Sequence, residues 1–295
     1  MTTTLIHHAA NRQGLFPVGS LAALQDCVSA GVRWVEVDLI PLADGDFVLL
    51  HDPDLTTASN GIGSVIEKTK ADLSGLFYRQ TDGSISPHAL STLSQLVSWV
   101  KNQDSPTQIQ LDLKPYAPLT IPVLESLLKH LRPIQERVLI SSVADWAVRL
   151  LFHLEPKINL GFDPLLYLDL KSDTPRPAGV PPLRVGAYGM LDEHPLSNQC
   201  WGNDGAYFAA RAEALYHQAP PGTAWYLNAW LLEKALDAGF DWVDFLHQRK
   251  AVVSAWTLDE PHLGLIRKLI QQNVDFITTN QAVEIKKELG AQIVL

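Results

Sequence analysis

Trp34-Val-Glu-Val-Asp-Leu39 and Gln108-Ile-Gln-Leu-Asp-Leu113 are the two stretches of this sequence that decide its fold class. Each is a short run of apolar and β-branched residues that carries acidic side chains toward its C-terminal end. Similar short runs recur along the chain and alternate with longer segments in which apolar residues are spaced three and four apart, as in amphipathic helices. Strands that alternate with helices predict a parallel sheet covered by helices.

Eight strands can be counted, and eight such units predict an α/β fold of the (β/α)₈ TIM-barrel type, which typically needs about 250 residues. The strands are expected at residues 4–7, 34–39, 108–113, 138–141, 158–162, 224–227, 252–256 and 274–278. Helical patterns lie at residues 20–30, 93–101, 121–131, 144–154 and 260–271. We find no internal repeat and no linker, and we therefore expect one domain over residues 1–295.

Two loop excursions interrupt the alternation of strands and helices. The first follows strand 2, where residues 51–88 are rich in Asp, Thr, Ser and Gly. The second separates strands 5 and 6 and is rich in proline, and within it residues 183–190 could form a further strand. Long loops over the mouth of a barrel commonly decide specificity, and we expect residues 163–222 to do so here.

The composition excludes several classes of protein. The 32 acidic and 23 basic residues give a formal charge of −9, which disfavours nucleic acid and anionic membrane surfaces as partners. No apolar run approaches the roughly 20 residues of a transmembrane helix. The first residues lack the pattern of a signal peptide, and two cysteines, Cys27 and Cys200, are too few for a disulfide framework. We therefore expect a cytoplasmic protein. The sequence does not indicate its oligomeric state.

Ionisable side chains gather at the ends of the early strands, where barrel enzymes place their chemistry. Glu36 and Asp38 are two residues apart and so project from one face of their strand. Asp112 and Lys114 repeat this arrangement on the next strand, and His7 ends the first one. A second histidine, His51, follows a short apolar run after the second strand and is followed by Asp52.

These residue types together suit the hydrolysis of a phosphodiester. Glu36, Asp38 and Asp112 offer hard oxygen ligands, which fit Mg²⁺ or Ca²⁺ better than a soft metal. Lys114 supplies a positive charge for a phosphate oxygen. Two histidines can act as general acid and general base near neutral pH. The alternative is structural, because Glu36 and Asp38 could instead belong to a salt-bridge network with Arg33 or Lys114.

An ordered set of motifs resembles the glycerophosphodiester phosphodiesterase family over nearly the whole chain. The family pattern is His-Arg-Gly near the start, then Glu-x-Asp, His-Asp after an Asp-Gly turn, Glu-x-Lys, and Trp-Thr-Val-Asn near the end. The matching stretches are Ile6-His-His-Ala9, Glu36-Val-Asp38, Asp44-Gly-Asp-Phe-Val-Leu-Leu-His-Asp52, Asp112-Leu-Lys114 and Trp256-Thr-Leu-Asp259. Each motif alone is weak, and their order carries the resemblance.

The resemblance implies a metal-assisted hydrolysis of glycerophosphodiesters, or of lysophospholipid-type diesters, to an alcohol and glycerol phosphate. It implies that Glu36, Asp38 and Asp112 hold the cation and that His7 and His51 transfer protons. His8, Lys114 and Trp256 would contact the substrate. The headgroup and the native metal are left open.

Four departures from the family pattern mark this chain. His8 stands in place of arginine, which replaces a bidentate phosphate clamp by an imidazole. Asp112 replaces glutamate and shortens one metal ligand by a methylene, which Ca²⁺ tolerates better than Mg²⁺ does. Pro17-Val-Gly-Ser20 replaces Pro-Glu-Asn-Thr, and Asn280 replaces aspartate. Two alternatives follow: a catalytically silent barrel that binds a phosphorylated ligand, and a lyase that stops at a cyclic phosphate.

Overall fold

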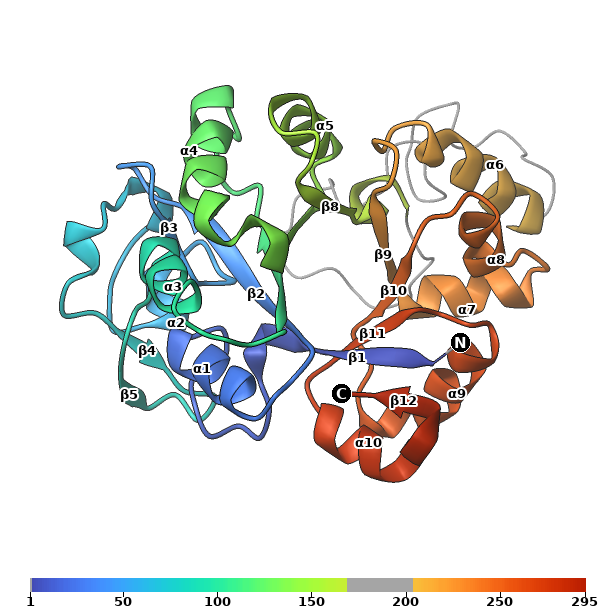
Figure 1. Ribbon diagram of the computed structural model, residues 1–295, viewed down its shortest axis with the longest axis horizontal. Coiled ribbons are helices and arrows are strands. Elements are labelled where there is room, and N and C mark those ends of the chain that lie inside the picture. Colours follow the sequence, from blue (N-terminus) through green and yellow to red (C-terminus); the bar gives the residue numbers. More distant parts are fainter. Residues whose placement is uncertain (1, 169–203) are drawn as a thin grey trace.

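The computed structural model describes residues 2–168 and 204–295 and is built around a closed barrel of parallel strands (Figure 1). Neighbouring strands pair in the order β1-β2-β6-β7-β8-β9-β10-β11, and β11 pairs with β1 to close the ring. The barrel strands are β1 (Thr3–His7), β2 (Trp34–Pro41), β6 (Gln108–Leu113), β7 (Val138–Ser142), β8 (Asn159–Phe162), β9 (Ala224–Asn228), β10 (Val253–Trp256) and β11 (Phe276–Thr279). The predicted TIM barrel is confirmed, and each strand begins and ends within two residues of its predicted position.

Helices surround the barrel on the outside (Figure 1). They are α1 (Leu21–Ser29), α3 (Leu93–Val100), α4 (Ile121–Leu131), α5 (Asp145–Leu154), α6 (Asp204–Tyr216), α7 (Ala229–Asp237), α8 (Trp242–His247), α9 (Leu263–Gln271) and α10 (Ala282–Leu289). Side-chain caps fix where some of them begin: the Ala23 N–H donates to Ser20 Oγ at the start of α1, over 3.1 Å. The helix expected over residues 260–271 is divided, because residues Glu260–His262 form a separate 3₁₀ turn before α9.

Alternation along the strands separates an outer core from the barrel interior. Val35, Val37 and Leu39 point outward and pack against the helices, in a core continuous with α1, α3, α4 and α5. A second outer core lies under α6 to α10. The interior holds a small apolar cluster whose buried members are Ile6, Leu139 and Tyr226. Glu36 and Asp38 alternate with the outward residues, so their side chains enter the barrel.

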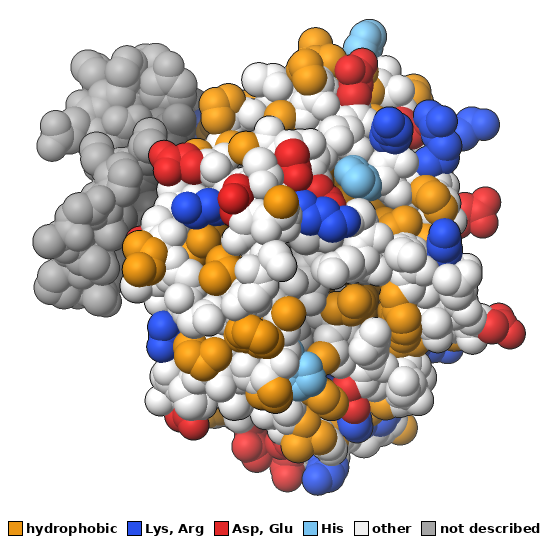
Figure 2. Space-filling view, turned by 90° about the vertical axis from the view of Figure 1, so that its left-hand side faces the viewer, with side chains coloured by type: hydrophobic (Ala, Val, Ile, Leu, Met, Phe, Trp, Pro, Cys, Tyr) orange, Lys and Arg blue, Asp and Glu red, His pale blue; other side chains and the backbone are white. Residues whose placement is uncertain are grey.

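The excursion after strand 2 is an ordered subdomain with its own apolar core. It contains β3 (Phe47–Val48), α2 (Leu55–Ala58), the 3₁₀ turns Val65–Glu67 and Ala71–Leu73, and the antiparallel pair β4 (Phe77–Arg79) and β5 (Ile85–Ala89). Its core includes Ile40, Leu55 and Tyr78. On the side of the molecule that carries β3 and the β4–β5 pair, acidic and basic side chains are interspersed with apolar and uncharged ones (Figure 2).

The excursion between strands 5 and 6 is described in part. It begins with the 3₁₀ turn Pro164–Tyr167, and from residue 204 it forms helix α6, which packs against α7 and α8. The expectation of long loops throughout residues 163–222 is therefore wrong for α6, whose inner face fills the outer core. The strand expected at residues 183–190, and Cys200, lie outside the described residues. Within the described ranges, no helix is long and apolar enough to cross a bilayer.

The remaining short elements lie at the ends of the barrel strands. They are the 3₁₀ turns His8–Ala10, Arg132–Arg137 and Gly290–Gln292 and the strand β12 (Ile293–Val294), which pairs with β1. The turn at His8–Ala10 matters for the site, because Ala9 and Ala10 have φ angles of 48° and 50°, in the left-handed region. This backbone turns the chain sharply over the C-terminal end of β1.

Candidate active site

Three carboxylates meet inside the barrel at the C-terminal ends of β2 and β6. The parallel register places Asp38 beside Asp112, and Glu36 lies one inward position earlier on β2. One ligand oxygen from each of the three lies within 4.8 Å of the others. A group of three oxygen donors at this spacing fits a single hard divalent cation.

The negative charges around Glu36 favour the binding of a positive charge among the three carboxylates. Its side chain is buried, and burial together with the charges of Asp38 and Asp112 raises the pKa of the Glu36 carboxyl well above the ordinary value. The Ala9 N–H donates to Glu36 Oε2 over 2.8 Å, which holds the carboxylate in place. The left-handed backbone at Ala9 aims this N–H at the carboxylate. A cation at the site would relieve the repulsion among the three acids.

Lys114 places a positively charged side chain against two of the three carboxylates. Its Nζ lies 2.7 Å from Asp38 Oδ1 and 2.6 Å from Asp112 Oδ2. Burial opposes the charge, but Asp112, Asp38 and Glu36 together raise the pKa of the Lys114 ammonium. The salt-bridge alternative is therefore present in part, since Lys114 pairs with two of the three acids, whereas Arg33 makes no ion pair with any described residue.

Ser141 orients the third carboxylate and was not anticipated from the sequence. Its Oγ donates to Asp112 Oδ1 over 2.8 Å and accepts from Gln110 Nε2 over 2.9 Å. The register aligns Asp112 with Ser141 on β7. Carboxylates that bind metals are commonly held by such outer hydrogen bonds. The sequence feature that could have indicated Ser141 is its hydroxyl side chain at the end of the fourth predicted strand.

The structure does not bring His7 into this group. The imidazole is fully buried, and its Nδ1–H donates to the Asn11 carbonyl over 3.1 Å. His7 pairs along the sheet with Val35, which faces outward, and the charges that act on His7 come from Arg12, Asp26 and Glu284 rather than from the three acids. Burial is the main cause that lowers the pKa of His7.

His8 points toward the carboxylates instead. Its Nε2 lies 3.9 Å from Glu36 Oε2, and its Nδ1 lies 2.8 Å from Asn280 Oδ1. Asn280 Nδ2 donates to Asp259 Oδ2 over 3.0 Å, which fixes the orientation of the amide. Because the amide oxygen must then face His8, Nδ1 is the donor and a neutral His8 ring presents a bare Nε2 to the site. Asn280, at a position where the chain departs from the family pattern, therefore selects the tautomer.

His51 follows the short strand β3 and is exposed to solvent. Its side chain is 58% exposed, and Nδ1 lies 3.1 Å from Asp52 Oδ1. Burial raises the pKa of the Tyr116 phenol, a largely exposed residue on which the charges of Lys114, Asp52 and Asp38 also act. The charge of Asp52, the partner of His51, and that of Asp38 therefore act on the same phenol.

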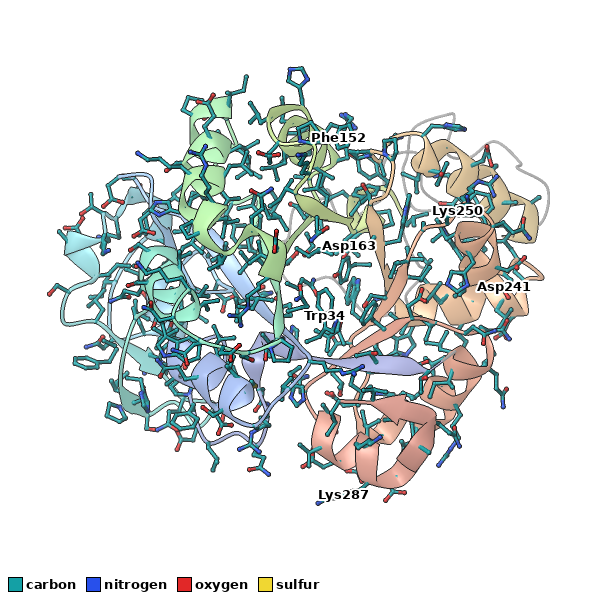
Figure 3. All side chains as sticks on the ribbon, in the orientation of Figure 1. Trp34, Phe152, Asp163, Asp241, Lys250 and Lys287 are labelled. Carbon is teal, nitrogen blue, oxygen red and sulfur yellow. The ribbon has the colours of Figure 1, made fainter. Side chains whose placement is uncertain are left out.

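Asp163 is a further acid of the site that the sequence had not indicated. It follows β8, and in Figure 3 it projects within the ring of strands, whereas Asp241, Lys250 and Lys287 lie on the outer ring. Burial, and next the charge of Asp112, raise the pKa of its carboxyl well above the usual range. The indole of Trp256 lies beside Asp163, at the end of β10. The sequence feature that could have indicated Asp163 is its place directly after the predicted strand at residues 158–162.

Comparison with known proteins places this arrangement in a family. The family model described as "Glycerophosphoryl diester phosphodiesterase family" matches residues 12–284. The chain belongs to this family. The matched segment contains the three carboxylates, Lys114, His51 and Trp256, and it begins four residues after His8.

Two relatives in the phosphodiesterase family are similar to about half of the chain. The glycerophosphodiester phosphodiesterase of Caldanaerobacter subterraneus subsp. tengcongensis is 25% identical over 170 residues, which are 57% of this chain and 68% of that protein. The glycerophosphodiester phosphodiesterase of Bacillus altitudinis is 28% identical over 157 residues, which are 50% of this chain and 61% of that protein.

Solved structures of glycerophosphodiester phosphodiesterases have a similar fold. A crystal structure from Parabacteroides distasonis matches with a TM-score of 0.69 at 18% identity and covers 98% of this chain and 97% of that one. A phosphodiesterase from Oleispira antarctica, in complex with the product sn-glycerol-3-phosphate, matches with a TM-score of 0.65 at 19% identity, over 98% of this chain and 97% of that one. These likenesses concern the fold.

Proposed function

We propose that this chain is a metal-dependent phosphodiesterase that hydrolyses glycerophosphodiesters to an alcohol and glycerol phosphate. The observation that carries the proposal is the group of buried Glu36 and Asp38 and partly exposed Asp112, inside a barrel of this family and with Lys114 beside it. A buried cluster of like charges is costly for a protein unless a cation compensates it.

Glu36, Asp38 and Asp112 would hold Mg²⁺ or Ca²⁺. The raised pKa of Glu36 and the common spacing of the ligand atoms support this assignment. Asp112 is one methylene shorter than the glutamate of the family, and flexible oxygen coordination by Ca²⁺ accommodates that change better. When bound, the ion supplies a Lewis acid that polarises a phosphoryl oxygen and acidifies a coordinated hydroxyl.

The other groups would bind the phosphate and move protons. Lys114 places its ammonium where a phosphate oxygen can replace part of its contact with the acids. His8 presents a bare Nε2 that can accept a proton from the attacking hydroxyl, with Asn280 holding the opposite nitrogen. His51, anchored to Asp52, has its other nitrogen free to protonate the leaving alcohol. In this proposal His8 takes the proton-transfer role that the family resemblance implies for His7.

The assignment of the two histidines is tested by steady-state kinetics at saturating cation. We expect His8→Ala and His51→Ala each to lower kcat by about a hundredfold or more, the usual contribution of general acid–base catalysis. His7→Ala should lower the midpoint of thermal unfolding while the folded fraction keeps most of its turnover. His153→Ala, on the exposed side of α5, is the matched control. A larger loss of kcat in folded His7→Ala than in His8→Ala would reverse the assignment.

A further inference from the structure

A cavity of about 490 Å³ lies at the end of the barrel opposite the active site. All strands of a parallel barrel begin at the same end, and the first residues of five barrel strands line this cavity: Trp34, Gln108, Asn159, Ala224 and Phe276. None of the three carboxylates of the active site is among the described residues that line it. Cavities of this volume commonly hold a small molecule.

Small side chains on neighbouring strands leave this space open. The interior of a parallel barrel is normally filled by layers of bulky side chains. Here β9 begins with the inward residue Ala224, which pairs with Gly161 on β8. On the other side of β9, the inward residue of β10 is Ser254. The lower part of the barrel therefore lacks the bulky residues that would fill it.

The walls of the cavity are mainly apolar and aromatic. The buried residues of the interior cluster, Ile6, Leu139 and Tyr226, all line it. Trp34 and Phe276 add an edge-to-face pair of rings whose centroids lie 5.1 Å apart. Trp34 lies within the ring of strands (Figure 3). A molecule with an apolar ring that enters the cavity is removed from water and packs against these side chains, which favours binding.

One hydrogen-bonding group in this wall has no partner. Ser254 lies between Val253 and Ala255, which pack in the outer core, so its side chain points into the barrel. Ser254 is 2% exposed, and its Oγ makes no hydrogen bond with the described residues. A buried hydroxyl without a partner costs free energy, and a ligand that donates to it or accepts from it removes that cost.

Charge in the wall is confined to an exposed residue. Lys157 is the one charged side chain among the described lining residues, and it is exposed to solvent. The inner wall is uncharged, and an ionised group loses far more free energy on leaving water than a hydroxyl that keeps a hydrogen bond. The cavity therefore fits an uncharged molecule with an apolar ring and one hydrogen-bonding group.

We propose that this cavity is a second ligand site, which binds a small uncharged aromatic alcohol with Ser254 Oγ as its hydrogen-bond partner. The carboxylates of the active site do not line the cavity, so binding needs no cation and does not compete with a phosphate ester. The inference does not depend on the proposed phosphodiesterase function.

Equilibrium dialysis of the whole chain with 2-naphthol, naphthalene and 2-naphthoate tests the site, because the three probes share a ring system and differ in their polar group. We expect 2-naphthol to bind about five- to tenfold more tightly than naphthalene, which corresponds to one hydrogen bond. The anion 2-naphthoate should bind more weakly than 2-naphthol. Ser254→Ala should make the Kd values of 2-naphthol and naphthalene nearly equal. Because Ser254→Ala removes an unpartnered hydroxyl, the fold should be retained.

A second variant tests the place of binding. Ala224→Leu should fill the cavity and abolish binding of 2-naphthol, whereas the matched control Ala71→Leu, in an exposed 3₁₀ turn, should not change it. An excess of sn-glycerol-3-phosphate with Mg²⁺ should not displace 2-naphthol. Four results would overturn the inference: no saturable binding of 2-naphthol, a preference over naphthalene that Ser254→Ala leaves as it is, tighter binding of 2-naphthoate, or displacement by sn-glycerol-3-phosphate.

Discussion

Replacement of Glu36 by glutamine should have opposite effects on stability with and without a divalent cation. The ligand oxygen of Glu36 lies within 4.8 Å of those of Asp38 and Asp112. At an effective dielectric constant of about 20, two unit charges at that separation repel by about 3.5 kcal/mol, so two neighbours give about 7 kcal/mol. Attraction to Lys114 and the hydrogen bond from Ala9 offset much of this. We expect Glu36→Gln to stabilise the cation-free protein by about 2 kcal/mol at neutral pH.

The sign of the pH dependence follows from the raised pKa of Glu36. Below its ordinary value of 4.5 the group is protonated in the folded and the unfolded chain, and it costs no stability. As the pH rises from there through the folded pKa, the unfolded chain releases its proton more readily, and the wild-type protein loses stability. The advantage of Glu36→Gln should therefore be absent below pH 4.5 and complete above the folded pKa.

The assay is thermal unfolding over a range of pH, with chelator and then with Mg²⁺ or Ca²⁺. About 2 kcal/mol corresponds to a rise in Tm of roughly 4 °C for a chain of this size. Cation at a hundred times its Kd should stabilise the wild-type protein by about 2.7 kcal/mol and the variant by much less. Glu288→Gln, exposed on α10, is the matched control and should change neither value. The reasoning is refuted if cation-free Glu36→Gln is less stable than wild type at neutral pH, or if cation stabilises both equally.

Three further substitutions test separate parts of the site. Ser141→Ala removes the hydrogen bond that orients Asp112, so cation affinity measured by titration calorimetry should fall about tenfold, and the Tm of the cation-free protein should fall by a few degrees because Gln110 Nε2 loses its acceptor. Gly161→Ala would place a Cβ 2.5 Å from the ring of Tyr226, and chemical denaturation should show a loss of about 1–3 kcal/mol. Ala9→Gly relieves a left-handed φ of 48° and should leave stability equal or up to about 1 kcal/mol higher, whereas a clear loss in denaturation would contradict the strain at Ala9.

The fold was predictable because each barrel strand is a short apolar run that contrasts with the amphipathic segments around it. The carboxylate group was predictable for a related reason: Glu36, Asp38 and Asp112 interrupt such runs at inward positions, and side chains there converge once the barrel closes. Lys114 followed from its place two residues after Asp112. These inferences need only the rule that successive side chains of a strand point to opposite faces.

Which of His7 and His8 faces the carboxylates could be learned only from the three-dimensional structure. Successive residues of a strand point to opposite faces, and the register of β1 against its neighbours cannot be read from one sequence. The observed pairing of His7 with Val35 turns His7 outward and leaves His8 facing Glu36. The placement of Asp163 and Ser141 near Asp112 also depends on how the strands pair, because an aspartate or a serine at a strand end is common in any sequence.

The central claim is that this chain cleaves glycerophosphodiesters by means of a divalent cation held by Glu36, Asp38 and Asp112. Phosphorus NMR of a reaction with glycerophosphocholine tests it most directly, first with chelator and then with Mg²⁺ or Ca²⁺ added in excess. We expect no change with chelator and conversion to glycerol phosphate after addition of the cation. A cyclic phosphate that persists would identify a lyase instead, and an unaltered diester after long incubation with either cation would contradict the claim.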